Sequence, residues 1–175
     1  MLKYKWTFWF DKPDLKISDE NWDQFLVKID SFQTIRGFWC IFNNILLPSE
    51  FQHGINLHLF KSHIEPKWED INNFHGGKWM ITISKQIGPF VNKLWEKTLV
   101  ALIGGIYDDI VMESINGIVL SVRKNIIKIA IWTKDSFDIN LQLKIGKLWK
   151  SILKQNLFLN NLILEYYPHT TFLVN

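Results

Sequence analysis

The chain has 175 residues, a length typical of one domain, and 47% of them are hydrophobic, enough to bury a substantial core. Its formal net charge of +3 excludes a protein that coats long nucleic acid through charge alone. No apolar run approaches the roughly 20 residues of a membrane-spanning helix, and the N-terminus lacks the apolar stretch of a secretory signal. The single cysteine, Cys40, cannot form an internal disulfide, so a reducing compartment is expected.

Apolar periodicity predicts the secondary structure in chain order. Strands are expected over residues 4–10, 25–32, 55–60, 78–84, 117–122, 128–133, 162–167 and 171–174. Helices are expected from residue 35, with Thr34 as N-cap, to before residue 47, from 89 to 103, and from 139 to 153. About eight strands and three helices indicate a single α+β domain over residues 1–175. We expect one curved antiparallel sheet with the helices packed on its convex face.

Two long polar segments, residues 11–21 and 61–77, interrupt this pattern, and a tryptophan is associated with each. Most of the nine tryptophans are expected in the core, because Trp is large and apolar. Trp22 and Trp68 instead have polar neighbours, which makes each a candidate stacking platform. Taken alone, each is equally consistent with a loop tryptophan folded back onto the core.

Two indoles beside a carboxylate can select one kind of ring. A flat ring can lie between the indoles, and their faces attract it further if it is cationic. Glu69 or Asp70 can accept two hydrogen bonds from a guanine edge, whereas a carboxylate cannot pair in this way with adenine. Methylation of guanine at N7 makes the ring cationic, so a methylated guanine suits both features.

Two basic residues beside a predicted hairpin offer an exit for phosphates. Arg123 and Lys128 flank a predicted hairpin, and either can reach a phosphate chain that leaves the slot. A solvated surface charge is the usual role of a lysine. For Arg123 that reading is weaker, because only two of the 20 basic residues are arginines.

The sequence shows no constellation for catalysis. There is no paired acidic cluster for a metal, no Gly-rich phosphate loop, and no Ser/His/Asp or Cys/His arrangement. The five histidines are scattered along the chain. We therefore expect no metal, no cofactor and no enzymatic activity. Removal of the cap from RNA by this protein would contradict the expectation that it is not an enzyme.

Several motifs together are highly specific: residues 6–10 (WTFWF), 38–39 (FW), 59–61 (LFK), 64–70 (IEPKWED), 76–79 (GGKW), 102–104 (LIG), 122–123 (VR) and 128–133 (KIAIWT). With these, the chain resembles the eukaryotic translation initiation factor 4E family, the mRNA cap-binding proteins, over essentially its whole length. The family fold is a cupped antiparallel sheet with three helices on its convex back, as expected above.

The resemblance implies roles for individual residues in binding capped mRNA. The positions concerned are Trp22 and Trp68 as stacking indoles, Glu69 at the guanine edge, Trp132 at the N7-methyl group, Arg123 and Lys128 at the triphosphate, and Lys78 as a further phosphate contact. Lys78 stands where the family often has arginine. The implied protein is a monomer in the cytoplasm, with a nuclear pool also compatible.

The resemblance also implies a second surface for a scaffold initiation factor and for inhibitory proteins that carry a Y-x-x-x-x-L-Φ helix. Its residues would be Ile35 and Trp39 on the first helix, and Lys97, Val100, Ile103 and Gly104 on the second. On helical spacing alone, Trp39 would instead be a buried core residue.

Lys97 departs from the family pattern, which has an acidic residue at this position. A cap-binding paralogue that represses translation therefore remains an alternative to a translation factor.

Overall fold

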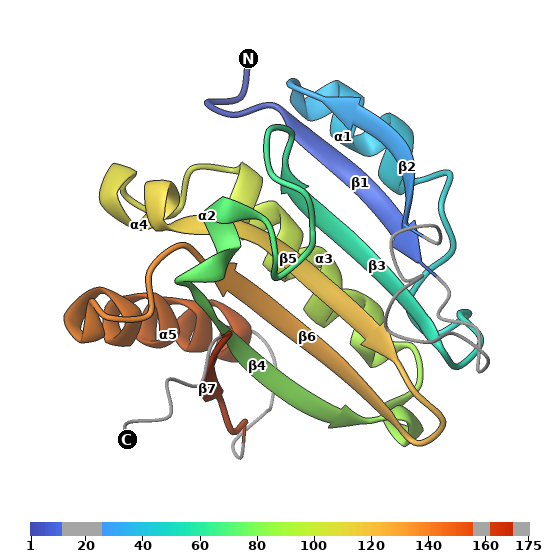
Figure 1. Cartoon of the computed structure of the whole chain (residues 1–175). Helices are drawn as coiled ribbons and strands as arrows, with labels where there is room; N and C mark the ends of the chain where they lie inside the picture. Colours follow the sequence, from blue (N-terminus) through green and yellow to red (C-terminus); the bar gives the residue numbers. More distant parts are fainter. Residues whose placement is uncertain (12–25, 156–161, 170–175) are drawn as a thin grey trace.

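Among the residues that the computed structural model describes, 1–11, 26–155 and 162–169, seven strands form one antiparallel sheet (Figure 1). The strands are β1 (Trp6–Asp11), β2 (Leu26–Phe32), β3 (Ile55–Lys61), β4 (Gly77–Ser84), β5 (Ile115–Val122), β6 (Ile126–Thr133) and β7 (Glu165–Pro168). Their order across the sheet is β2-β1-β3-β5-β6-β4-β7. The predicted fold class is confirmed, and the expected strand over residues 171–174 lies outside the described residues.

The described residues form five α-helices and one 3-10 helix, rather than the three helices expected. They are α1 (Ile35–Phe42), α2 (Ile71–Phe74), α3 (Phe90–Ile103), α4 (Asp109–Ser114), α5 (Ile139–Lys154) and the 3-10 helix η2 (Lys85–Ile87). The prediction missed α2 and α4 because four and six residues are too few to display a helical period. Each begins at an aspartate N-cap, Asp70 and Asp108, whose carboxylate accepts a backbone N–H of the first turn.

The ends of the long helices follow local sequence signals. Thr34 caps α1 as expected, and its hydroxyl accepts a hydrogen bond from the Gly37 N–H at 2.9 Å. The helix stops at Phe42, earlier than predicted, and asparagines occupy the C-cap position and the residue after it. Helix α3 ends at Gly104, and Gly105 then takes the positive φ of 74° that favours glycine.

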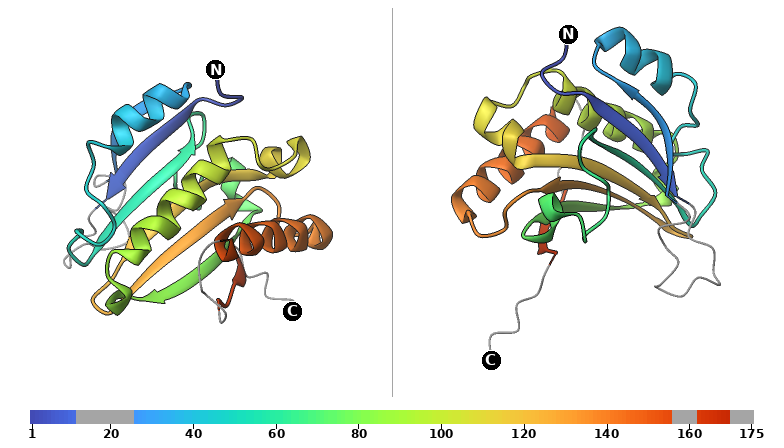
Figure 2. Two further views of the ribbon diagram at one scale, coloured as in Figure 1. Left: turned by 180° about the vertical axis from the view of Figure 1, so that it is seen from behind. Right: turned by 45° about the horizontal axis from the view of Figure 1, so that its top comes forward.

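Alternation along the strands separates the sheet into an apolar face and a more polar one. Leu57, Leu59, Ile129 and Ile131 are buried in the main core cluster, against helix residues such as Trp95. Figure 2 shows α1, α3 and α5 lying across this face, which we call the helical face of the molecule. The opposite face of the curved sheet, turned toward the viewer in Figure 1, is the open face.

The tryptophans of the described residues differ widely in burial. Trp6, Trp95 and Trp149 are fully buried, as expected for most residues of this type. Of the tryptophans in the described ranges, Trp68 alone is exposed.

In the described ranges, no helix combines the length and apolarity needed to cross a bilayer.

Candidate functional site

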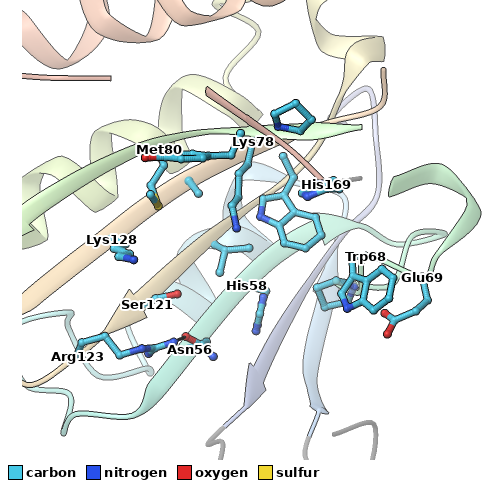
Figure 3. A pocket seen from close by; sticks show the side chains of 16 residues that line it. Asn56, His58, Trp68, Glu69, Lys78, Met80, Ser121, Arg123, Lys128 and His169 are labelled. Carbon is cyan, nitrogen blue, oxygen red and sulfur yellow. Dashed lines mark hydrogen bonds between the residues drawn. The ribbon is translucent and has the colours of Figure 1, made fainter. Parts of the chain in front are cut away.

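The open face of the sheet contains a cavity of about 1030 Å³ (Figure 3). Its walls come from β3 to β7 and from the loop between β3 and α2. The lining side chains are Asn56, His58, Pro66, Trp68, Glu69, Lys78, Met80, Val119, Ser121, Arg123, Lys128, Ala130, Trp132, Tyr167, Pro168 and His169. The residues from β3, β4, β5 and β6 in this set are spaced by two, because alternate side chains point to the same face of a sheet.

The cavity brings together most of the residues predicted from the sequence. Trp68, Glu69, Lys78, Arg123, Lys128 and Trp132 all line it. In Figure 3, Trp68 and Glu69 lie on one side, while Arg123 and Lys128 lie on the other. The predicted partner of Trp68, Trp22, lies outside the described residues.

Trp68 projects from a loop whose backbone is held by buried amides. Trp68 is 54% exposed, whereas Asn73, in the α2 helix that follows the loop, is completely buried. The Asn73 Nδ2 donates to the carbonyls of Glu65 at 2.9 Å and Lys67 at 2.7 Å. Asn116 on β5 in turn donates to the Asn73 Oδ1 at 2.9 Å. The sheet therefore fixes the loop that presents Trp68, since each of these bonds would be costly to leave unmade.

Contacts within the loop decide which of its two carboxylates is available. The Asp70 Oδ2 accepts from the Glu65 N–H at 2.9 Å, and its Oδ1 accepts from the backbone and side-chain amides of Asn72 at 2.8 Å. Asp70 is thus committed to the loop. The exposed Glu69 carboxylate has no hydrogen bond or ion pair within the described residues, so it is free to accept two donors from a ligand.

Arg123 is positioned by a buried polar network beneath the cavity. Its Nη2 donates to the Asn56 Oδ1 at 2.9 Å, and its Nη1 donates to the Val122 carbonyl at 3.0 Å. The Asn56 Nδ2 donates to the Asp11 Oδ2 at 3.1 Å, across the β1–β3 register. The other oxygen of Asp11 lies 3.0 Å from His58 Nε2, and both side chains are almost completely buried. This network fixes the guanidinium at the cavity wall.

Lys78 and Lys128 add positive charge beside Arg123. They lie on neighbouring strands, β4 and β6, and each points into the cavity. Burial lowers the pKa of Lys78, and the nearby Lys128 ammonium lowers it further. In the described ranges, neither lysine forms an ion pair, so the cations of this wall remain available to an anion.

Trp132 lies in a cluster of rings at the other end of β6. Its ring centroid is 5.5 Å from that of Phe60, in an edge-to-face arrangement, and 4.2 Å from that of His169. The Lys78 Nζ lies 6.0 Å from the Trp132 ring centroid. Burial, with the charge of Lys78, lowers the pKa of His169 from 6.5 to about 4. His169 is therefore neutral at pH 7.

The His169 environment predicts a loss of stability in mild acid. In the unfolded chain the imidazole titrates near pH 6.5, so below that pH the unfolded state binds more protons. The stabilisation from neutral His169 is full above pH 6.5 and falls as pH decreases to about 4. We expect an NMR titration of His169 with a midpoint near 4, and a shallower loss of thermal stability between pH 6.5 and 4 in a His169→Gln variant. A midpoint near 6.5 would contradict this environment.

Sequence reasoning missed the polar floor of the cavity. Asn56 and His58 alternate with leucines in β3, and that alternation was a usable signal for a strand with one polar face. Asp11 was assigned to a loop, although it ends β1 and pairs with Asn56. Met80, Ser121 and Tyr167 were also missed, since only the strand order brings them to one place.

A family model described as eukaryotic initiation factor 4E matches residues 1–175. The chain belongs to the eukaryotic initiation factor 4E family. It is 38% identical to eukaryotic translation initiation factor isoform 4E of Arachis hypogaea over 152 residues, which are 87% of this chain and 73% of that protein. It is 40% identical to initiation factor 4E-1 of Arabidopsis thaliana over 155 residues, 89% of this chain and 64% of that protein.

Solved structures of eIF4E proteins share the fold. The Ascaris suum eIF4E-3 complex with an m2,2,7G cap matches with a TM-score of 0.87 and 32% identity, over 97% of this chain and 91% of that one. The schistosome eIF4E complex with m7GpppG and 4E-BP matches with a TM-score of 0.83 and 29% identity, over 95% and 87%. The expectation that the chain is not an enzyme agrees with its membership of a family of initiation factors.

The predicted partner residues of this eIF4E family member lie on the helical face. Ile35 on α1 is 62% exposed, and Trp39 is half-buried rather than a core residue. The Trp39 ring packs on Phe38 and Phe42 with centroids 5.0 and 5.6 Å away. Val100 and Ile103 on α3 are half-buried. Gly104 follows them along the chain. The Lys97 ammonium donates a hydrogen bond to the Gln155 carbonyl at the end of α5.

In the described part of the chain, no group of three or more His, Cys, Asp and Glu side chains lies together in a way that could hold a metal ion.

Proposed function

We propose that this chain binds the N7-methylguanosine cap of mRNA in the cavity and recruits the mRNA for translation initiation through a scaffold factor on the helical face. One observation carries the proposal. A single cavity presents an exposed indole and an available carboxylate on one side, and Arg123 with Lys128 on the other. A methylated guanine followed by a triphosphate has complementary groups in the same order.

The base is held by stacking and by its hydrogen-bonding edge. Trp68 supplies one indole face, and Trp22 supplies the other in this proposal. Stacking is worth about 1–3 kcal/mol per base, and a desolvated cationic ring adds up to about 2 kcal/mol. Glu69 accepts the ring N–H and the amino group of guanine, while Trp132 contacts the N7-methyl group. His169 beside Trp132 is neutral, so it does not add a positive charge that would repel the methylated ring at this end of the cavity.

The phosphates extend toward the basic wall. Arg123, held by Asn56, and Lys128 contact the triphosphate, and Lys78 contributes from β4. Relatives support this assignment, because structures of eIF4E proteins contain cap ligands: m2,2,7G and m7G caps in Ascaris suum, and m7GpppA and m7GpppG in the schistosome. The Caenorhabditis elegans and schistosome proteins were solved with the binding proteins Mextli and 4E-BP.

A titration with cap analogue tests the proposal directly. N7-methyl-GTP is expected to quench the intrinsic tryptophan fluorescence with micromolar or tighter affinity. Unmethylated GTP should bind about 5- to 30-fold more weakly, because it lacks the cationic ring whose attraction to the indoles is worth about 1–2 kcal/mol. Equal affinity for the two nucleotides would reject the cationic slot, and no quenching by either would reject cap binding.

The alternative function is a cap-binding repressor that holds the cap without recruiting a scaffold. Lys97 favours it, because this cation replaces the acid that receives a basic residue of the partner in the family. Pull-down of the chain with a Y-x-x-x-x-L-Φ scaffold peptide would separate the two roles, since only the translation factor requires that interaction.

A further inference from the structure

Basic residues greatly outnumber acidic ones on the three long helices. Along α1, α3 and α5 there are seven basic residues and one acidic residue, whereas the whole chain has 20 basic and 17 acidic residues. The basic residues are Arg36, Lys93, Lys97, Lys144, Lys147, Lys150 and Lys154. The acid is Glu96. The helical face is therefore a local source of positive potential.

Few of these cations are neutralised by the protein itself. Lys144 pairs with Asp108 at 2.6 Å. Within the described residues the other six form no ion pair. The Lys97 ammonium donates to a backbone carbonyl at the end of α5, a neutral partner that holds it between α3 and α5. An approaching partner thus meets cations whose charge is not compensated.

Three of the cations lie close to apolar residues that are exposed or half-buried. Lys93, Lys97 and Val100 are spaced by four and three residues, so they follow one side of α3. Arg36 is exposed next to Ile35 at the start of α1. An apolar strip bordered by charge is the complement of an amphipathic helix with apolar anchors and a charged edge.

We propose that the segment that binds this face is an amphipathic helix whose polar edge is acidic, with Asp or Glu facing Lys93 and Lys97. This inference rests on the proposed function, which places a scaffold factor on the same face. RNA is the other polyanion that a basic surface attracts. The apolar residues Ile35, Val100 and Ile103 favour a protein helix, because phosphate contacts need no apolar surface.

The test uses two synthetic helical peptides that share the Y-x-x-x-x-L-Φ anchors and differ only in four edge positions, Glu in one and Lys in the other. Binding to the full chain is measured by fluorescence anisotropy at low and high salt. At low salt, the Glu peptide should bind at least about tenfold more tightly than the Lys peptide. At high salt, the difference between the two affinities should be smaller. A Lys93→Glu/Lys97→Glu variant should reverse the preference, and Lys93→Glu alone should reduce it.

A Lys124→Glu/Lys134→Glu variant, with the same change of net charge away from the helices, should keep the wild-type preference. Equal or tighter binding of the Lys peptide overturns the inference, and so does an unchanged preference in the Lys93/Lys97 variant. It is also overturned if neither peptide binds while uncapped RNA binds the wild type and loses affinity in that variant. Titration of each variant with N7-methyl-GTP reports on the cap cavity independently, so failure of cap binding is distinguishable from failure of this inference.

Discussion

Glu69→Ala is expected to lower the affinity for N7-methyl-GTP by roughly 100-fold. The carboxylate would accept two hydrogen bonds from guanine, and each hydrogen bond to a charged group contributes about 1.5–3 kcal/mol, so about 3 kcal/mol or more is lost. Asp70 cannot replace it, because both Asp70 oxygens already accept donors within the loop. Stacking by Trp68 should remain and should leave weak, less selective binding.

Selectivity identifies the cause of that loss more sharply than affinity. N7-methyl-inosine triphosphate lacks the amino group of guanine but has the same cationic ring. Wild type should discriminate strongly between the two, and the Glu69→Ala and Glu69→Gln variants should not. Glu65→Ala is the matched control, since this carboxylate of the same loop pairs with Lys67 at 2.9 Å and is directed to no ligand in the proposal. Full discrimination by Glu69→Ala would show that another group reads the base.

Arg123→Ala should weaken binding of N7-methyl-GTP by about 10- to 100-fold, equivalent to about 1.4–2.8 kcal/mol. The guanidinium makes charge-assisted hydrogen bonds to phosphate in this proposal, and it is fixed in advance by Asn56 and the Val122 carbonyl. The bare N7-methylguanosine nucleoside should bind almost equally well to variant and wild type, because it carries no phosphate. Salt should weaken binding less steeply in the variant.

Two further variants separate charge from geometry at this position. Lys124→Ala removes the neighbouring, exposed cation of the same hairpin and should change the affinity for the triphosphate little. Arg123→Lys keeps the charge but loses the planar group that reaches Asn56 and the backbone together, so its affinity should be intermediate. If Arg123→Ala weakened the nucleoside as much as the triphosphate, its effect would be a general disturbance of the sheet rather than loss of a phosphate contact.

Local sequence was sufficient for the residues whose setting is local. Trp68 and Glu69 lie in a polar segment with no apolar period, and the structure places both at the cavity with Trp68 exposed. Lys128 was predicted from its place beside the hairpin, and Trp132 followed from the family resemblance; both line the cavity from β6. The choice between Glu69 and Asp70 did not follow from the residues, because it depends on hydrogen bonds to Glu65 and Asn72 that close only in the folded loop.

The sequence by itself determined the fold class, the long helices and most strand positions, because each rests on a period of two or 3.6 residues. The residue types of the site came instead from polar tryptophan contexts and from the family motifs. Only the tertiary structure decided that β4 lies between β6 and β7, and that Asp11, Asn56 and Arg123 meet beneath the cavity. Pairing between distant strands leaves no local periodic signal, and a buried polar residue such as Asp11 resembles a loop residue until its partners are known. The physical reason is that alternation encodes which face a side chain takes, whereas neighbours across the sheet are selected by the packing of the whole domain.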